Sequence, residues 1–520
     1  MRYSLTDDQP EGPVQADVAI VGAGLAGLVL AQRLAADGVS VAILESGPVR
    51  QDEEVHPLNQ VEQAAQEYRG AAEGRARGLG GTSTRWGGAL LPYLGYDLQP
   101  HPGGWHQGWN LPTAELDEFL ASIENDFGVA SGSYEGGGDA RYLPSFEPRL
   151  PKWPLFKNRS TANIYRKQIE SDPAINIWTD ATVTDLRIGD GRVSGIVAKS
   201  SAGHSLEVNA KHVAITAGAI ETTRLLLLFD RAQDQRLFPA ESPLGKGFHD
   251  HLSAPIARLE ITDRNALSRL FGFRFVPGGM RNLRFELSPE ARAAKNRPAA
   301  FLHVAFTSTE DSGFAGLRRV YQAAQKAKLP APGDLIDIAR DLPWFLRAGW
   351  WRFTKKRVLA PPQSEFELHL VTEQEPVLDN TIGLSNGLND RFGLPLARVD
   401  WRVHDQDIEH FHAIASLAIG EWSEGPLADL AKPVPRLEAD IRQELAGCGG
   451  IYHPAGTTRI GANATEGVVD SDLRVYGVPG LWAIATSVFP SIGGTSPSLG
   501  LMQFAARAAR QISAEVRQGG

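Results

Sequence analysis

The residues with the clearest chemical meaning form the run GAGLAG, from Gly22 to Gly27. An apolar stretch, Asp17 to Val21, leads into this run, and a leucine-rich stretch follows it. In a strand, turn and helix unit of this kind, Gly22 makes the tight turn, Gly24 lets backbone amides approach a pyrophosphate, and Gly27 lets the helix pack close to the strand. The pattern predicts a dinucleotide site whose phosphates lie at a helix N-terminus.

A carboxylate extends this pattern. Glu45 ends the next apolar stretch, VAILE, at 23 positions after Gly22. This spacing is close to the ~20 residues expected for the acid that binds the ribose hydroxyls of a dinucleotide. Because an acid here repels a 2′-phosphate, the sequence argues against NADP.

A second glycine cluster, RARGLGGTSTRWGG, follows at Arg75 to Gly88. A nicotinamide protein needs no second glycine-rich loop so soon after the first. An extended flavin does, since its pyrophosphate and its ring are approached by bare backbone at separate places. The cluster therefore favours FAD. The cofactor-binding residues predicted in it are Gly80, Gly81, Thr82, Ser83, Arg85, Trp86 and Gly87.

A third cluster, YHPAGTTRIG at Tyr452 to Gly461, contains a histidine followed by small residues. Oxidation of an alcohol by a flavin needs a base beside the face of the ring that accepts hydride. The residues next to this base must have small side chains, so that substrate can enter. His453 is the candidate base. A lone histidine often has only a structural role, so this pattern by itself leaves both interpretations open.

Composition narrows the class of protein. The chain has 520 residues, 42% of them hydrophobic and 22% charged, and a formal net charge of -9. The acidic balance argues against nucleic acid as the main partner. The single cysteine, Cys448, excludes an internal disulfide. We expect no membrane span, because no run of ~18 apolar residues occurs. We expect a cytoplasmic location, because the N-terminus lacks signal-peptide features.

Periodicity along the chain predicts an α/β protein with an interrupted nucleotide domain. One helix is predicted within 108–129, capped by Asn110 or Thr113 and with Leu116, Phe119, Leu120 and Ile123 on one face. Strands alternate over 176–215 with a hairpin turn at Asp190-Gly191. The segment AITAGAIETTRLLLL repeats the strand, glycine turn and helix order. Residues 259–445 are the candidate second domain. A last helix is predicted from Leu501 to Val516.

The order of these motifs resembles that of the glucose-methanol-choline (GMC) flavoprotein oxidoreductases over nearly the whole chain. The likeness rests on GAGLAG, GLGGTSTRWGG, ITAGAIETTRLL, YHPAGTTRIG and SVFPSIGGTSPSL. It implies a discontinuous FAD-binding domain of glutathione-reductase type, and a substrate domain built on an antiparallel sheet flanked by helices. The expected FAD-binding domain comprises 12–100, 176–258 and 446–520. The expected substrate domain comprises 101–175 and 259–445.

The resemblance also assigns roles to single residues. His453 matches the catalytic histidine of the family, and Ser496 falls on its second active-site position, usually Asn or His. A serine hydroxyl can hydrogen-bond a substrate oxygen but is no base near neutral pH. The further positions matched to cofactor binding are Val183, whose backbone would face adenine, Ala217, Thr486 and Ser487.

The run STRW, Ser83 to Trp86, is similar to the STHW of pyranose oxidases, whose histidine is bonded covalently to FAD. Arg85 occupies that place here. Because a guanidinium stays protonated, it is a poor nucleophile, and we expect FAD to be bound without a covalent link. The likeness also favours a carbohydrate substrate.

The sequence thus predicts an FAD-dependent oxidase or dehydrogenase that oxidises the alcohol of a sugar, polyol or glycoside and passes electrons to oxygen or another acceptor. Two alternatives stay open: a non-carbohydrate alcohol as substrate, or a flavin-binding protein without alcohol chemistry. The run His249-Asp250-His251 resembles a metal cluster, but it matches a loop of the family, and no metal is expected. The aromatic and basic segment 341–359 is a packed helix, a substrate lid, or a membrane or partner surface.

Overall fold

Apolar runs from distant parts of the chain form one parallel sheet. The computed structural model describes residues 1–50, 54–101, 103–105, 107–136, 142–325, 329–436, 441–448 and 450–518. In spatial order the strands of this sheet are β1 (Arg2–Ser4), β8 (Ile175–Thr179), β4 (Val41–Leu44), β3 (Val18–Val21), β12 (His212–Ile215) and β22 (Leu481–Ala483). All neighbours pair in parallel. Strands β3, β4 and β12 are buried at every residue, as expected where both faces of a sheet are covered.

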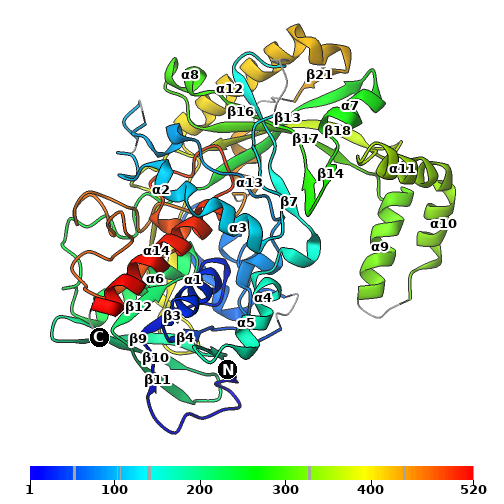
Figure 1. Cartoon of the computed structure of the whole chain (residues 1–520). Coiled ribbons are helices and arrows are strands. Elements are labelled where there is room, and N and C mark those ends of the chain that lie inside the picture. Colours follow the sequence, from blue (N-terminus) through cyan, green and yellow to red (C-terminus); the bar gives the residue numbers. More distant parts are fainter. Residues whose placement is uncertain are drawn as a thin grey trace.

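The helices that cover this sheet confirm the predicted unit. Helix α1 (Leu25–Ala36) connects β3 to β4, and α6 (Ala219–Ala232) follows β12. The C-terminal helix α14 (Ser498–Gln518) packs against α1, and the two lie side by side in Figure 1. Helix α14 is longer at both ends than the predicted helix. The first and last parts of the chain therefore share one core.

A smaller sheet, of four strands, lies in the same half of the molecule. Its strands in spatial order are β2 (Val14–Gln15), β11 (Ser205–Asn209), β10 (Arg192–Lys199) and β9 (Thr182–Gly189). The turn between β9 and β10 has φ of 52° at Asp190 and 74° at Gly191. Positive φ at both central residues is the mark of the primed turns that suit hairpins, and the predicted hairpin is confirmed.

The second half of the molecule contains the antiparallel sheet that the resemblance implied. In spatial order its strands are β21 (Ala431–Pro435), β13 (His251–Ile261), β18 (Glu365–Glu373), β17 (Ala300–Thr307), β16 (Arg284–Leu287) and β6 (Phe146–Arg149). Every pair is antiparallel. Its helices are α7 (Arg264–Phe271), α8 (Pro289–Ala293), α12 (Asp405–Glu424) and α13 (Ile441–Cys448). Large side chains such as Trp401, Phe411 and Trp422 fill the core on this side.

Two details differ from the sequence-based expectation. Strand β13 crosses the predicted boundary at 258/259, so the antiparallel sheet begins at His251. The single helix predicted within 108–129 is two helices, α2 (Thr113–Asp117) and α3 (Leu120–Asp126). Both pack against α14, and Leu116 and Ile123 join the core of the parallel-sheet half. Part of the expected substrate segment 101–175 thus packs with the nucleotide half.

Short sheets connect the two halves. In one, β5 (Val61–Gln63) pairs in parallel with β20 (Pro395–Asp400), which in turn pairs with β19 (Thr381–Asn389). The other consists of β14 (Arg274–Val276), β15 (Gly279–Arg281) and β7 (Lys152–Pro154). Helices α4 (Thr161–Ile164) and α5 (Arg166–Ser171) precede β8.

Three helices form an arm that projects from the antiparallel-sheet half (Figure 1). They are α9 (Gly313–Gln325), α10 (Pro332–Arg340) and α11 (Leu342–Thr354), and we call residues 313–354 the helical arm. Helix α11 contains most of the aromatic and basic segment, and Trp351 is its one buried residue. Among the described residues, no helix is both long and apolar enough to cross a bilayer.

Candidate active site

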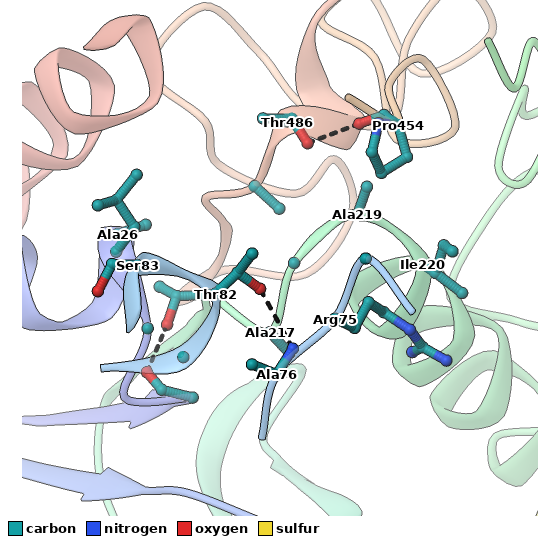
Figure 2. Close-up of a pocket in the computed structure, with 18 of the residues that line it drawn as sticks. Ala26, Arg75, Ala76, Thr82, Ser83, Ala217, Ala219, Ile220, Pro454 and Thr486 are labelled. Atoms are coloured by element: carbon teal, nitrogen blue, oxygen red, sulfur yellow. Dashed lines mark hydrogen bonds between the residues drawn. The ribbon is translucent and has the colours of Figure 1, made fainter. Parts of the chain in front are cut away.

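One cavity lies where the glycine-rich loops, the β12–α6 turn and the C-terminal segment meet (Figure 2). Its empty volume is about 1170 Å³, including the part open to solvent. In Figure 2, Thr82 and Ser83 lie across the cavity from Pro454 and Thr486. The predicted site residues that line the cavity are Gly22, Gly24, Glu45, Gly81, Thr82, Ser83, Trp86, Ala217, His453 and Thr486.

The first glycine-rich turn has the geometry that its sequence predicts. Gly22 has φ of +101°, and a Cβ there would lie 3.0 Å from the carbonyl oxygen of Thr216. A Cβ at Gly27 would lie 2.0 Å from the carbonyl oxygen of Gly22. Gly27 does not line the cavity, because its role is to let α1 approach β3 closely.

The second glycine-rich loop touches the first. The amide of Gly80 donates to the carbonyl of Ala23 at 2.9 Å, and a Cβ at Gly81 would lie 2.8 Å from the Cα of Gly24. Gly24 is the N-cap of α1 and provides no side-chain cap, so the first amides of the helix are left for a ligand. This side-chain-free cradle fits the pyrophosphate of a dinucleotide such as FAD.

Glu45 has a structural role that its sequence position did not predict. Its buried carboxylate accepts hydrogen bonds from the amides of Ala23 at 2.8 Å, Gly47 at 2.9 Å and Gly78 at 2.9 Å. Burial raises the pKa of Glu45, although these three bonds favour the carboxylate. Glu45 therefore ties the two glycine-rich loops together while it faces the cavity.

Two arginines in the cavity wall went unnoticed in the sequence. Arg77 and Arg75 contact Glu221 at 2.6 and 3.4 Å, and Glu221 also pairs with Arg224 at 2.8 Å. Burial lowers the pKa of Arg75 to about 9, and its neighbour Arg77 acts in the same direction. Burial works against ionisation of Glu221 too, but Arg77 and Arg224 outweigh it and lower its pKa. The arginines add positive charge to a wall that suits an anionic ligand.

A buried aspartate fixes the turn that carries the candidate base. Asp250 accepts hydrogen bonds from the amides of Tyr452 and His453, at 3.0 and 2.9 Å, and from the hydroxyl of Tyr68 at 2.6 Å. Burial raises the pKa of Asp250 to about 7, against the pull of these bonds. Tyr452 has φ of 68°, a conformation that needs such support in a residue other than glycine.

A second histidine sets the proton arrangement of the first. His251 Nε2 lies 2.8 Å from the carbonyl oxygen of Gly493, and its Nδ1 lies 3.0 Å from His453 Nδ1. A carbonyl only accepts, so Nε2 of neutral His251 carries the proton and its Nδ1 accepts from His453 Nδ1. The lone pair of His453 is thereby placed on Nε2. Burial lowers the pKa of His453 to about 4 and that of His251 well below its ordinary value, so both rings are neutral near pH 7.

The ligand atoms of Asp250, His251 and His453 all lie within 4.8 Å of one another, close enough to hold a metal ion. In this structure those groups hydrogen-bond to each other and to backbone. His249, the remaining member of the 249–251 run, points Nδ1 at the carbonyl of Gly247 at 2.8 Å. The contacts present explain how His453 is oriented.

The other predicted site residues lie outside the cavity lining. Ser496 is partly buried, and its neighbours Pro497 and Ser498 line the cavity instead. Arg85 is exposed and lines an adjoining surface cavity that shares Ser83 and Trp86 with the first. Gly80, Gly87, Val183 and Ser487 line neither cavity.

Two residues of the predicted cofactor set support the turn that carries His453. The hydroxyl of Thr486 donates to the carbonyl of Pro454 at 2.6 Å (Figure 2). Buried Ser487 accepts from the hydroxyl of Thr458 at 2.6 Å, and its carbonyl accepts from the amide of Thr458 at 2.9 Å. These bonds join the C-terminal segment to the turn that carries His453.

The protein thus combines a Rossmann-like domain, whose cradle consists of bare backbone, with a second domain built on an antiparallel sheet. A neutral histidine lines the cavity beside the cradle. Together these features define a two-domain dinucleotide oxidoreductase. The fold and the comparisons that follow show an FAD-dependent oxidoreductase that is similar to the GMC oxidoreductases. The family model for GMC oxidoreductase matches residues 376–505, which include His453, and the model for an NAD(P)-binding Rossmann-like domain matches residues 20–49.

Known proteins resemble the chain over much or all of its length. It is 22% identical to the C-glycoside 3-oxidase of Microbacterium trichothecenolyticum, over 97% of this chain and 98% of that protein. It is 24% identical to the 2-methyl-1,2-propanediol dehydrogenase of Mycolicibacterium austroafricanum, over 65% of this chain and 54% of that protein. The crystal structure of pyridoxine 4-oxidase from Mesorbium loti superposes with a TM-score of 0.61 at 17% identity, covering 95% and 99% of the two chains. That likeness shows a shared fold.

Proposed function

We propose that this protein oxidises a CH–OH group of a sugar, polyol or glycoside to C=O, with His453 as the base. The observation that carries the proposal is the hydrogen-bonded series from Gly493 through His251 to His453, which leaves the lone pair on Nε2 of a residue that lines the cofactor cavity. A neutral imidazole with a fixed tautomer can accept a hydroxyl proton.

In this mechanism the substrate hydroxyl hydrogen-bonds to His453 Nε2. As the C–H bond breaks, the O–H proton moves to Nε2 and the carbon–oxygen single bond becomes a double bond. Bound FAD supplies the acceptor for the hydrogen and two electrons that leave the substrate carbon. His251 stabilises the imidazolium that forms, because its Nδ1 accepts a hydrogen bond from the protonated Nδ1 of His453. Positioned proton transfer of this kind contributes ~10²–10⁴ to a rate.

Ser496 is the proposed second polar residue at the substrate oxygen. Its hydroxyl would donate or accept one hydrogen bond, and His453 would act as the only base. The support for this role is the family resemblance, since Pro497 and Ser498, and not Ser496, line the cavity.

The carbohydrate assignment is supported by the STRW motif and by the C-glycoside 3-oxidase relative. The relative that acts on 2-methyl-1,2-propanediol supports the alternative of a non-carbohydrate alcohol. A flavin-binding role without alcohol chemistry is the third candidate. The electron acceptor is oxygen or another compound, and a cytoplasmic location stays a prediction from the N-terminal sequence.

FAD is proposed to be held without a covalent bond. The support is chemical, since a protonated guanidinium is a poor nucleophile, and geometric, since exposed Arg85 lines the adjoining surface cavity rather than the cofactor cavity.

Anaerobic mixing of the FAD-loaded protein with sugars, glycosides, polyols and aliphatic alcohols tests the proposal. Carbohydrate substrates should bleach the flavin, and His453→Ala should slow bleaching ~10²–10⁴-fold while FAD stays bound. The control is His249→Gln, which changes a buried histidine outside the cavity and should bleach normally. Acid precipitation should release the yellow colour to the supernatant.

The other outcomes separate the alternatives. Bleaching only by aliphatic alcohols would assign a non-carbohydrate substrate, and no bleaching by any compound would favour the binding role. Unimpaired reduction of the alanine variant would refute His453 as base. Colour retained on the acid precipitate would refute non-covalent binding.

A further inference from the structure

The helical arm carries more exposed apolar surface than the rest of the molecule. Of the 18 large hydrophobic side chains that are exposed among the described residues, ten belong to residues 313–354. Single exposed hydrophobic residues are ordinary on protein surfaces, but a contiguous patch marks a surface that binds something.

On α11 these side chains form a stripe. Leu342, Leu346, Trp350 and Phe353 are 52%, 71%, 55% and 75% exposed. Spacings of four, four and three residues put them on one face of the helix. Trp351, on another face, is buried. Helix α11 therefore packs on the body through one side and presents an apolar side to the surroundings.

Helix α9 repeats the arrangement. Phe314, Leu317 and Tyr321 are 39%, 44% and 58% exposed, and their spacing of three and four residues again defines one face. Phe314 contacts the ring of Trp344 at 6.2 Å between centroids, so the first turn of α9 adjoins α11.

The stripe on α11 adjoins positive charge. Residues 342–364 contain Arg347, Arg352, Lys355, Lys356 and Arg357 and no Asp or Glu, although the chain as a whole has a net charge of -9. Arg352 lies 3.4 Å from the ring centroid of Phe275, and Lys355 lies 5.6 Å from that of Trp350. Arg347, Arg352, Lys355 and Lys356 are all exposed, so their charges are available to an anionic surface.

We propose that the helical arm docks on an anionic lipid surface, with the apolar stripe of α11 inserted among the headgroups. Helices that lie in the membrane interface typically have Trp, Phe and Leu on one face and Lys and Arg at its border. A symmetric contact with a second copy would instead bring two basic runs together, which is unfavourable. The arm projects from the body (Figure 1), and the cavity lining contains none of its residues, so docking leaves the cofactor site unchanged.

Vesicle flotation tests this proposal on the FAD-loaded full chain, with no substrate present. The protein should float with vesicles that contain phosphatidylglycerol and much less with pure phosphatidylcholine. Leu346→Ser with Phe353→Ser should weaken binding at least about tenfold, because two exposed anchors are lost. Lys355→Gln with Lys356→Gln should weaken it about fivefold per charge removed, and added salt should act in the same direction.

The matched control is Leu378→Ser with Leu388→Ser, which removes two leucines that are 57% and 50% exposed outside the arm. This variant should float as the unchanged protein does. Retained flavin absorbance and an unchanged melting temperature show that each variant is folded. Absence of flotation with any vesicle would overturn the proposal. So would self-association in ultracentrifugation that the Leu346→Ser, Phe353→Ser variant abolishes while flotation persists, since a second copy would then be the partner.

Discussion

At the scale of single residues, the sequence identified the candidate base but not what holds it. His453 stood out because a histidine among small residues matched a known motif. Its partners, His251 and Asp250, lie about 200 positions earlier in the chain, in a run whose spacing resembled a metal cluster. A contact between residues so far apart in the chain depends on how the start of β13 packs against the turn that carries His453. The periodicity of the local sequence does not predict such packing.

The His251 contact leads to a prediction about tautomers. In His251→Phe, no acceptor faces His453 Nδ1, and the proton is free to move to Nε2, the position that must accept the substrate proton. The rate of flavin reduction at saturating substrate should fall by about 10–100-fold, by analogy with the large losses seen when a base is held in the wrong tautomer. Stopped-flow reduction under anaerobic conditions measures it.

The matched variant is His251→Gln, whose amide oxygen can accept from Nδ1 and should restore part of the rate. A pH profile adds a second readout. Because His453 has a pKa of about 4, the protonation that stops catalysis occurs below about pH 5, so the loss in His251→Phe should persist at higher pH. A rate recovered by raising the pH, or equal rates in the two variants, would contradict the tautomer explanation.

At the scale of elements, the strands and helices with strong periodicity were predicted well. The first strand, turn and helix unit, the hairpin at Asp190-Gly191, and helix α14 all follow from local pattern. The single helix predicted within 108–129 was wrong in its continuity, because the first helix ends at Asp117 and a second begins at Leu120, and both pack on α14. The pairing of β5 with β20 has no local signal either, because it joins residues 336 positions apart, such as Glu62 and Arg398.

The contact between the two glycine-rich loops gives an element-scale prediction. Gly81 has φ of +51°, and a Cβ there would lie 2.8 Å from the Cα of Gly24. Gly81→Ala should force the loops apart, at a cost of about 1–3 kcal/mol. Titration of the apoprotein with FAD should show at least tenfold weaker binding, which corresponds to about 1.4 kcal/mol.

Gly191→Ala is the control for the backbone strain alone. Gly191 has φ of +74° with nothing within 4 Å of a Cβ, and it does not line the cofactor cavity. This variant should lose some stability and keep its affinity for FAD. Equal affinity in Gly81→Ala and the unchanged protein would show that close approach of the loops is not needed for binding.

At the scale of the whole molecule, buried neutral histidines are distributed over both halves. Burial lowers the pKa of His101, His249 and His453 to about 4 and that of His303 to about 3. In the unfolded chain a histidine has a pKa of about 6.5. At a pH between that value and its lower pKa in the folded protein, each of these histidines is therefore protonated more fully in the unfolded chain than in the folded protein. The stability they contribute is complete above about pH 6.5 and is lost as the pH falls toward 4.

His249 isolates one such contribution, because its Nε2 is buried without a hydrogen-bond partner in the described structure. In His249→Gln, one titrating group is removed, so stability should fall less steeply on acidification, by at most about 1.4 kcal/mol per pH unit. Thermal unfolding from pH 7 to pH 5 measures the two slopes. Parallel slopes would show that His249 titrates alike in the folded and unfolded states.

The sequence also predicted the division into a nucleotide half and a second half on an antiparallel sheet, because the motif order matched a known family. It left open the role of the aromatic and basic segment. A run of Trp, Phe and Arg has the same local pattern whether the helix is covered or exposed, and only the position of α11 on the arm shows that Leu346 and Phe353 face outward.

The packing of α14 on α1 bears on how the protein is made. Helix α1 leaves the ribosome early, but the helix that covers it is complete only at Gln518. At about 5–20 residues per second, synthesis of the intervening chain takes on the order of a minute. During that interval α14 is not yet present to bury the apolar side of α1, and a chaperone can bind this exposed surface. Since Leu501 of α14 is part of the cavity wall, the cavity is complete only after α14 has been synthesised.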